Sequence, residues 1–292
     1  MSSSTDIKAP AEQGGQVTLT ATAVAPSRRG TSALVLSLRN ALPPLIVFVV
    51  IIAVWYLIRY LLPEGQKFVL PTPDAVLTEG VFDPQTMGDI LESAWHTTQV
   101  AITGLAIAAV LGITWAIAMS TASWVQRSTY AYAVVLQTIP ILAIVPLIGI
   151  WFGYEFNARV VVCVMISLFP MVANTLFGLQ SVERSMVELF KLQKASPLVV
   201  LTKLKLPAAL PSIFVGLRTS AGLSVVGAIV GDFFFQRGTP GLGSLISTYT
   251  RLLNMSALFA AIFVAALLGI VMFAVFGLLS KLAVGRWYDA TR

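Results

Sequence analysis

The sequence predicts an all-α membrane protein with six transmembrane helices and a cytoplasmic helical hairpin. Hydrophobic residues make up 57% of the 292 residues and charged residues only 11%, whereas a typical soluble domain is about 25% charged. The apolar residues are gathered in long runs, each close to the roughly 20 residues that a helix needs to cross a bilayer. One connection between these runs is longer than its neighbours and carries helix signals of its own.

The chain begins with a polar segment, residues 1–39, that is rich in Ser, Thr, Ala, Gly and Gln. Such a composition buries too little apolar surface to offset the ordering of the backbone, so we expect a disordered cytoplasmic tail. A membrane domain is expected at 40–285, followed by a short cytoplasmic tail at 286–292. The apolar run at 41–62 lies too far from Met1 for a cleaved signal peptide and is expected to be the first span.

The remaining spans follow from the later apolar runs. They are expected at 94–120, 130–152, 158–179, 208–234 and 257–284. The connection at 63–91 holds several prolines, which discourage continuous helix, and is predicted to be an outer loop with a short surface helix near its end. Most Lys and Arg residues fall on the side of the two termini and most acids on the other side, so the termini are predicted to be cytoplasmic.

Small residues indicate how the spans pack. They recur every fourth residue in the second span, and two more lie four residues apart in the fifth. In lipid, close backbone approach at small residues is what joins helices, so these positions are expected at helix contacts. They are Gly104, Ala108, Gly112, Ala116, Gly227 and Gly231.

The longest cytoplasmic connection, residues 180–207, is predicted to be a hairpin of two helices. The first helix is expected at 181–194. Ser196 followed by Pro197 is a helix start, because Ser accepts bonds from free amides and Pro fits the first turn. Pro207 is expected to stop the second helix. Exposed apolar residues on such a hairpin indicate a surface that binds a partner protein.

This connection resembles the signature loop of the membrane subunit, or permease, of binding-protein-dependent ABC importers. The family pattern is Glu-Ala-Ala, three residues, Gly, and about twelve residues later Leu-Pro. Glu188 holds the Glu position, Lys194 stands in place of the Gly, and Leu206 and Pro207 close the pattern. The resemblance implies contact with an ATPase through Glu188, Lys191, Lys194, Ala195, Ser196, Pro197, Leu206 and Pro207.

Two departures from the family pattern stand in this loop. Leu189 and Phe190 replace the two alanines, and Lys194 replaces the glycine. A helix C-terminus often needs a left-handed residue, which Gly adopts freely and Lys adopts at a cost of about 1 kcal/mol. The turn at Lys194 is therefore expected to be shaped differently.

The resemblance extends from about residue 42 to 285. FVLPTPDAV (68–76) is similar to the segment after the first span in permeases of the sulfonate, taurine and nitrate group. Further similar segments follow in family order: QTIPILAIVPLIGIWFG (137–153), FPMVANTLFGLQSV (169–182), LPAALPSIFVGLR (206–218) and GLGSLI (241–246).

The resemblance implies a permease subunit of an ATP-driven importer in a bacterial inner membrane. Its partners would be a second, identical permease subunit, a cytoplasmic ATPase dimer, an external binding protein and membrane lipid. The chain has no Gly-x-x-x-x-Gly-Lys-Ser/Thr loop, so ATP and magnesium are expected on the ATPase and no cofactor on this chain. The basic residues are scattered, which argues against a nucleic-acid partner.

Polar residues inside spans are costly and are therefore candidates for the translocation path. These are His96, Gln99, Gln137, Pro140, Asn174 and Asp232. His96 either lines the outer mouth of the path or lies at the interface among water and headgroups. Asp232 either takes part in gating or pairs with Arg237.

The two prolines of the third span, one arginine and the single cysteine also lie inside predicted spans. Pro140 and Pro146 interrupt helical bonding in the third span, so a bent span lining the path is expected. Arg218 is expected to have a structural role, by reaching the interface or pairing with a neighbouring subunit. Cys163, the single cysteine, is expected in ordinary packing.

The sequence contains no set of residues spaced for catalysis or metal binding. We therefore predict that the chain has no catalytic residues and no metal ligands. The resemblance implies a small organic anion such as a sulfonate or taurine, or nitrate, as substrate. The aromatic residues of GDFFFQRG (231–238) keep a ring compound open, riboflavin or a pyrimidine precursor of thiamine. The competing class is a stand-alone secondary transporter, which predicts an internal repeat that the sequence does not show.

Overall fold

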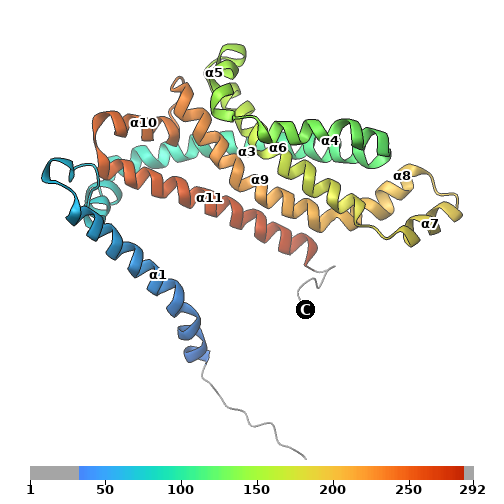
Figure 1. The fold of residues 1–292 in the computed structure, drawn as a ribbon, viewed down its shortest axis with the longest axis horizontal. Helices are drawn as coiled ribbons and strands as arrows, with labels where there is room; N and C mark the ends of the chain where they lie inside the picture. The colour runs from blue at the N-terminus through green and yellow to red at the C-terminus, as the bar shows by residue number, and fades with distance from the viewer. Residues whose placement is uncertain (1–32, 286–292) are drawn as a thin grey trace, which may run out of the picture. The chain divides into compact units, whose positions relative to one another are not determined.

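A computed structural model describes residues 33–285, and every element in that range is helical. The chain divides into two units at Ile51. Figure 1 shows the helices, coloured along the chain. They are α1 (Ala33–Leu61), η1 (Glu64–Gln66), α2 (Pro73–Ala75), η2 (Val76–Val81), α3 (Pro84–Thr121), α4 (Ser123–Thr138), α5 (Ile141–Phe152), α6 (Phe156–Gln180), α7 (Arg184–Leu192), α8 (Pro197–Val200), η3 (Leu201–Lys205), α9 (Leu206–Phe235), α10 (Leu242–Leu252) and α11 (Met255–Val284).

The helices confirm an all-α membrane protein. Within residues 33–285, five helical segments are long and apolar enough to cross a bilayer: 42–61 in α1, then α3, α6, α8 to α9, and α11. The pair α4 and α5 passes the same test together, although the two helices meet at 98°. Counted as one broken span, this pair gives the six crossings that the sequence predicts.

Two boundaries differ from the prediction. Helix α1 begins at Ala33, so residues 33–39, which the composition assigned to a disordered tail, are helical; residues 1–32 and the predicted tail at 286–292 lie outside the described residues. The outer loop holds a short helical segment, α2 and η2, as expected, and α3 begins at Pro84, earlier than the predicted start of the second span at residue 94. Asp83 caps α3, because its Oδ2 accepts a 2.9 Å hydrogen bond from the amide of Thr86. These bonds hold the pKa of the Asp83 carboxyl below its usual value.

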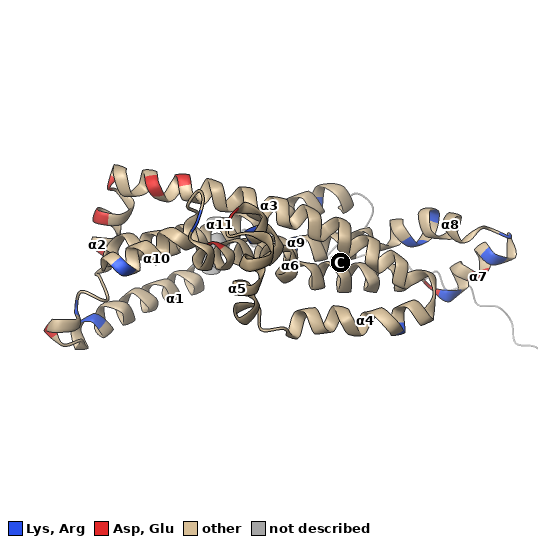
Figure 2. Ribbon diagram, turned by 90° about the horizontal axis from the view of Figure 1, so that it is seen from above, with Lys and Arg blue, Asp and Glu red and all other residues tan. Residues whose placement is uncertain are grey.

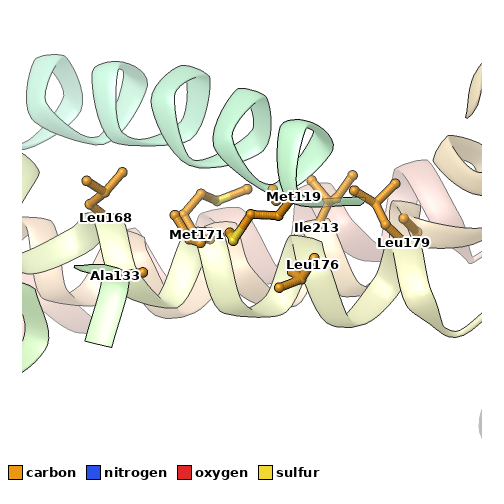
Figure 3. Packing of buried hydrophobic residues seen from close by; sticks show 10 residues of the cluster. Met119, Ala133, Leu168, Met171, Leu176, Leu179 and Ile213 are labelled. Carbon is orange, nitrogen blue, oxygen red and sulfur yellow. The ribbon is translucent and has the colours of Figure 1, made fainter. Parts of the chain in front are cut away.

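Helix α6 packs between α3 and α9 in the centre of the bundle. One buried apolar cluster fills the contact near the hairpin end of these helices, and Figure 3 shows its side chains interleaving between the ribbons. The cluster includes Met119 of α3, Met171 and Leu179 of α6, and Ile213 of α9. A second cluster continues along the same three helices. The three-helix contact therefore forms the packed core that positions both ends of the molecule.

The small residues singled out in the sequence all lie at these contacts. Ala108 and Ala116 are fully buried. A methyl group added at Gly112 would lie 2.8 Å from Met171 Cγ, and one at Gly231 would lie 3.2 Å from Arg159 Cα. The helices are thus close enough that larger side chains would push them apart.

Cys163 lies at the point where α6 meets both neighbours. A Cβ added at Gly104 of α3 would collide with Cys163 Sγ, and one added at Gly227 of α9 would lie 2.7 Å from Cys163 Cα. The thiol is completely buried and donates a 3.3 Å hydrogen bond to the carbonyl of Ser224. This confirms a packing role in the protein core.

The third span is broken at one of its two prolines only. Ile139, which precedes Pro140, has an extended backbone (φ −61°, ψ 125°), as expected for a residue whose helical conformation would clash with the following ring. Pro146 removes one backbone bond, as expected, but helix α5 continues through it without a break. A single lost backbone bond is tolerated inside this helix.

Candidate functional site

The end of α7 forms a tight, fully bonded turn. The amide of Lys194 donates to the carbonyl of Lys191 at 2.9 Å, and the amide of Ala195 donates to the carbonyl of Phe190 at 3.0 Å. This pair of bonds is the Schellman motif, which places a left-handed residue just after the helix. Lys194 has that conformation, with φ of 53°. The lysine therefore adopts the backbone shape for which the resembled family uses glycine.

The second helix of the hairpin starts as the sequence predicts. Ser196 Oγ accepts a 3.4 Å bond from the amide of Val199, and Pro197 occupies the first turn. The predicted stop at Pro207 is wrong, because η3 leads directly into α9 and the helix runs on to Phe235. In η3 the amide of Leu206 bonds five residues back, to Leu201, and this wider turn leaves room for the proline ring.

The hairpin extends beyond the bundle and exposes several large apolar side chains. In α7, Met186, Leu189 and Leu192 are 45%, 47% and 81% exposed, and Leu198 in α8 is 68% exposed. No residue of α7 is buried. Glu188 lies on the same short helix and is exposed. Exposed apolar residues beside charges are typical of a protein interaction surface.

Most acidic residues gather at one end of the unit formed by residues 52–285, whereas basic residues occur at both ends and predominate at the hairpin (Figure 2). Figure 2 shows Lys and Arg at α7 and α8, and Asp and Glu along the start of α3. The basic residues of the hairpin are Arg184, Lys191, Lys194, Lys203 and Lys205. One of them ties the hairpin to the bundle, because Lys205 Nζ donates a 3.1 Å bond to the carbonyl of Ser120 near the end of α3.

A buried ion pair lies at the opposite end of α9 from the hairpin. Arg159 Nη1 and Asp232 Oδ1 are 3.1 Å apart, with 4% and 2% of their side chains exposed. Arg159 also donates to the carbonyls of Arg237 and Thr239, the latter at 2.7 Å. One guanidinium thus links α6, α9 and the loop that follows α9.

The other side of Asp232 is bonded to the start of α10. Its carboxylate accepts from the amides of Gly241 (3.2 Å) and Ser244 (2.8 Å), and the amide of Leu242 donates to Thr97 Oγ1 at 2.8 Å. A Cβ at Gly241 would lie 2.7 Å from both Asp232 Oδ2 and Thr97 Oγ1. We call Thr97, Arg159, Asp232 and residues 241–244 the buried polar cluster.

The cluster corrects one expectation and adds residues that the sequence did not single out. The pairing of Asp232 with Arg237 is wrong: Arg237 lies with its guanidinium carbon 5.0 Å from the centre of the Tyr154 ring. Asp232 pairs instead with Arg159, a residue that the sequence analysis did not single out. The signal that would have found it is its position one turn inside the fourth span, where an unpaired cation is costly.

The other polar candidates do not gather at one site. His96 Nδ1 lies 3.4 Å from Gln99 Oε1, and the ring is 4.0 Å from Glu92, all on α3. Gln137 and Pro140 are exposed at the break between α4 and α5. Asn174 donates to the carbonyl of Pro170 at 2.8 Å, on the face of α6 that meets Gly216 of α9. Their role in a path stays a prediction.

Arg218 has a partner within the chain. Its guanidinium carbon lies 4.0 Å from the centre of the Phe273 ring, and Gly277, one turn further along α11, gives the side chain room. A cation over an aromatic face is stabilised in a lipid environment. The residue therefore joins α9 to α11.

Within the part of the chain that the structure describes, no three His, Cys, Asp or Glu side chains stand close enough to hold a metal ion.

The helices, the hairpin and the buried polar cluster together define the class of protein. The chain is a polytopic helical membrane protein with an exposed hairpin at one end of its core and a buried polar cluster at the other. Residues 108–284 match the family described as the binding-protein-dependent transport system inner membrane component. The chain belongs to this family, and its resemblance to ABC importer permeases is confirmed.

Three curated relatives share most of the chain. It is 32% identical to the formylaminopyrimidine transport permease ThiX of Halalkalibacterium halodurans, over 80% of this chain and 92% of that one. It is 29% identical to the riboflavin transport permease RibX of Chloroflexus aurantiacus, over 75% and 81% of the two chains. Identity to the putative aliphatic sulfonates permease SsuC of Escherichia coli is 28%, over 75% and 82%.

A solved structure shares the fold. A chain of the MetNI methionine ABC transporter, in an inward-facing conformation, superposes with a TM-score of 0.56 at 15% identity, covering 75% of this chain and 98% of that one. At this level of identity the likeness concerns the fold alone.

Proposed function

We propose that this chain is the membrane-spanning subunit of an ATP-driven importer and that residues 180–207 couple it to a separate ATPase. The observation that carries the proposal is the hairpin. It combines exposed apolar side chains with a rigid turn at Lys194 and a direct helical continuation into α9. A push on the hairpin is therefore transmitted along a helix that contacts both α3 and α6.

The proposed assembly has four kinds of partner. Two copies of the chain form a homodimer in a bacterial inner membrane with their termini in the cytoplasm, an ATPase dimer binds ATP and magnesium, and an external binding protein delivers the solute. The basic hairpin supports this orientation, because Lys and Arg are favoured on the cytoplasmic side. The chain itself carries out no chemistry, and its two states are shifted by nucleotide binding elsewhere.

Reconstitution tests the role of the hairpin. The permease, its ATPase and its binding protein in liposomes should accumulate solute only with ATP. Glu188→Lys is expected to reduce ATP-driven uptake at least about tenfold, because each 1.4 kcal/mol lost from docking is a factor of ten. Asp89→Lys, an equal charge reversal on an exposed residue of α3, should leave uptake unchanged.

Two results would contradict the proposal. Equal uptake by the Glu188 variant and the unaltered chain would remove the hairpin from coupling. Uptake by the purified chain alone, driven by an ion gradient, would favour a secondary transporter.

For the substrate we propose a flat nitrogen heterocycle, with a sulfonate as the second candidate. The relatives named for formylaminopyrimidine and riboflavin are 32% and 29% identical to this chain, and the one named for sulfonates is 28% identical. The sequence motifs alone had favoured the sulfonate, taurine and nitrate group. The aromatic residues Phe233 and Phe234, both more than 40% exposed, suit a ring compound better than a small inorganic anion.

Ligand binding by the external partner decides between these substrates. The binding protein encoded beside this chain, titrated in a calorimeter, should bind an aminopyrimidine or a flavin more tightly than taurine, an alkyl sulfonate or nitrate. Tighter binding of a sulfonate would reverse the ranking.

A further inference from the structure

A pocket of about 470 Å³ lies between the hairpin and the end of α3. It is lined from α3 by Ser120 and Thr121, and from the hairpin by side chains that include Lys191, Leu198 and Lys205. We propose that this pocket binds the phosphate-bearing headgroup of an anionic phospholipid. The proposal rests on the orientation given above, which puts this end of the bundle at the cytoplasmic leaflet.

The charge of the pocket favours an anion. Two of its lining side chains are lysines, and none of the lining side chains is acidic. Two ammonium groups around one cavity create a positive potential that attracts phosphate. Basic pockets between transmembrane helices on the cytoplasmic side are typical sites for anionic headgroups.

The two lysines are held differently. Lys205 is partly buried and its Nζ already donates to the carbonyl of Ser120. An ammonium has three donors, so two remain for a ligand from a side chain whose position is already fixed. Lys191 is exposed in the last turn of α7. A phosphate between them would connect α7 to the end of α3, to which Lys205 is already bonded.

The hydroxyl groups of the pocket do not compete for this role. Ser120 Oγ donates to the carbonyl of Ile117 and Thr121 Oγ1 to that of Ala118, at 2.9 and 2.7 Å. Their hydrogens are committed to the helix, so they offer only acceptor lone pairs to a ligand. Recognition of an anion therefore depends on Lys191 and Lys205.

The apolar part of the lining favours a lipid over a free ion. Val187, Leu198 and Leu201 also line the pocket, and Leu198 is 68% exposed. Inorganic phosphate gains nothing from apolar neighbours, whereas the glycerol and first methylenes of a lipid gain from burial. The place of the pocket, where α3 ends and α9 begins, is the level at which headgroups lie if α3 and α9 span the bilayer.

Such a lipid would brace the hairpin against the bundle. In residues 33–285, few polar contacts join the two, and the bond from Lys205 to Ser120 is one of them. A headgroup touching Lys191 as well would stiffen α7 and so improve transmission from the hairpin to α9. Anionic lipid is thus expected to raise coupling efficiency in the assembled transporter.

Native mass spectrometry of the purified full chain tests the site without any partner. Phosphatidylglycerol should be retained at least about tenfold more tightly than phosphatidylcholine with the same acyl chains. Each lysine near an anionic surface contributes about fivefold to affinity, so the double variant Lys191→Gln with Lys205→Gln should lose most of this preference. Lys203→Gln, an exposed lysine of η3 outside the pocket lining, is the matched control.

Several outcomes separate the lipid from its alternatives. Equal retention of phosphatidylglycerol by the double variant and the unaltered chain would overturn the proposal, as would equal retention of phosphatidylcholine. Displacement of the lipid by millimolar inorganic phosphate would make the site one for a free anion and would also overturn it. Replacing Lys205→Gln by Lys205→Arg in the double variant should restore part of the phosphatidylglycerol binding. This recovery would show that loss of charge, and not loss of fold, explains the weaker binding of the double variant.

This measurement is independent of the proposed function. It uses no ATPase and no nucleotide, so a chain that failed to couple ATP to uptake would still show or lack the lipid preference. Conversely, loss of the preference in a transporter that still imports solute would overturn the lipid site alone.

Discussion

The two ends of α9 are stabilised by opposite means. At its C-terminal end, the buried polar cluster holds Arg159 and Asp232 almost entirely away from solvent, with each charge bonded to backbone groups of a neighbouring segment. At its N-terminal end, the hairpin has no buried residue in α7 and holds its shape through its own turn. One end is fixed by many contacts with the rest of the chain, whereas the other depends mainly on bonds within the hairpin and has the Lys205–Ser120 bond as its polar link to α3.

This difference teaches where movement can occur. Removing one partner of a buried ion pair leaves an uncompensated charge and is costly, so the cluster keeps α6, α9 and α10 together. The hairpin has fewer such contacts: no residue of α7 is buried, although Val200 of α8 is buried and Lys205 bonds to Ser120. Segments with few buried contacts are the ones that open or shift most readily.

The largest effect is expected from breaking the ion pair. Asp232→Asn should lower the free energy of unfolding by about 3–5 kcal/mol, because Arg159 is left charged and buried. Thermal unfolding of the purified protein in detergent measures this loss. Adding Arg159→Met should recover part of it, whereas Asp89→Asn at an exposed position should change nothing. An unchanged free energy of unfolding for Asp232→Asn would mean that the buried polar cluster does not stabilise this end of α9.

A smaller effect is expected from the close helix contacts. Gly104→Ala would place a methyl group against the Cys163 thiol, and overpacking of this kind costs about 1–3 kcal/mol. Gly88→Ala in the same helix has open space around it and should gain up to about 1 kcal/mol from reduced freedom of the unfolded chain. The same unfolding assay compares the two. Equal stability would contradict the tight contact of α3 with α6.

At the hairpin, one substitution should strengthen the structure. Lys194→Gly relieves the left-handed backbone and should stabilise the turn by about 1 kcal/mol, seen as slower amide exchange in residues 184–196. Lys191→Gly lies inside α7 and should speed exchange by a similar amount. The global unfolding midpoint should barely move in either case, because the hairpin depends mainly on bonds within itself. A large shift of that midpoint would show that the hairpin unfolds together with the bundle, which would contradict the difference between the two regions.

The smallest effect concerns the cap of α3. The pKa of Asp83 is lowered by its bonds with Thr86, so its stabilising contribution is present above the unfolded value of about 3.9 and is lost as the pH falls through the lower folded value. The protection of amides in the first turn of α3, measured relative to their intrinsic exchange rate at each pH, should therefore fall below about pH 4. Asp83→Asn keeps the cap without titrating, and should remove this pH dependence. A persistent dependence would assign it to another carboxyl.

Local signals predicted much of this fold. Apolar runs gave the spans, the small residues fell at helix contacts, and Ser196 with Pro197 marked a true helix start. Each of these signals depends on residues within one or two helical turns, where the spacing of residues along the chain determines which of them interact. The different turn shape expected at Lys194 was wrong, because the lysine adopts the left-handed backbone that a glycine would adopt.

Signals that depend on distant partners were missed. Arg159 and Asp232 are far apart in the chain, and the nearer Arg237 was a reasonable partner for Asp232 until the loop placed it over Tyr154. Prolines were also ambiguous. Pro140, Pro146 and Pro207 all lack an amide, but only the first breaks a helix, because neighbouring backbone geometry decides whether the ring is accommodated.

The burial of Cys163 has a practical consequence for spectroscopy. Its thiol is enclosed between α3 and α9, so maleimide and nitroxide reagents should not reach it while the core is folded. A cysteine introduced at an exposed hairpin position such as Leu192 would then carry the label alone, with no need to replace the native residue. Reaction of Cys163 itself would report opening of the three-helix contact, so one chain offers both a label for the hairpin and an internal indicator of the packed core.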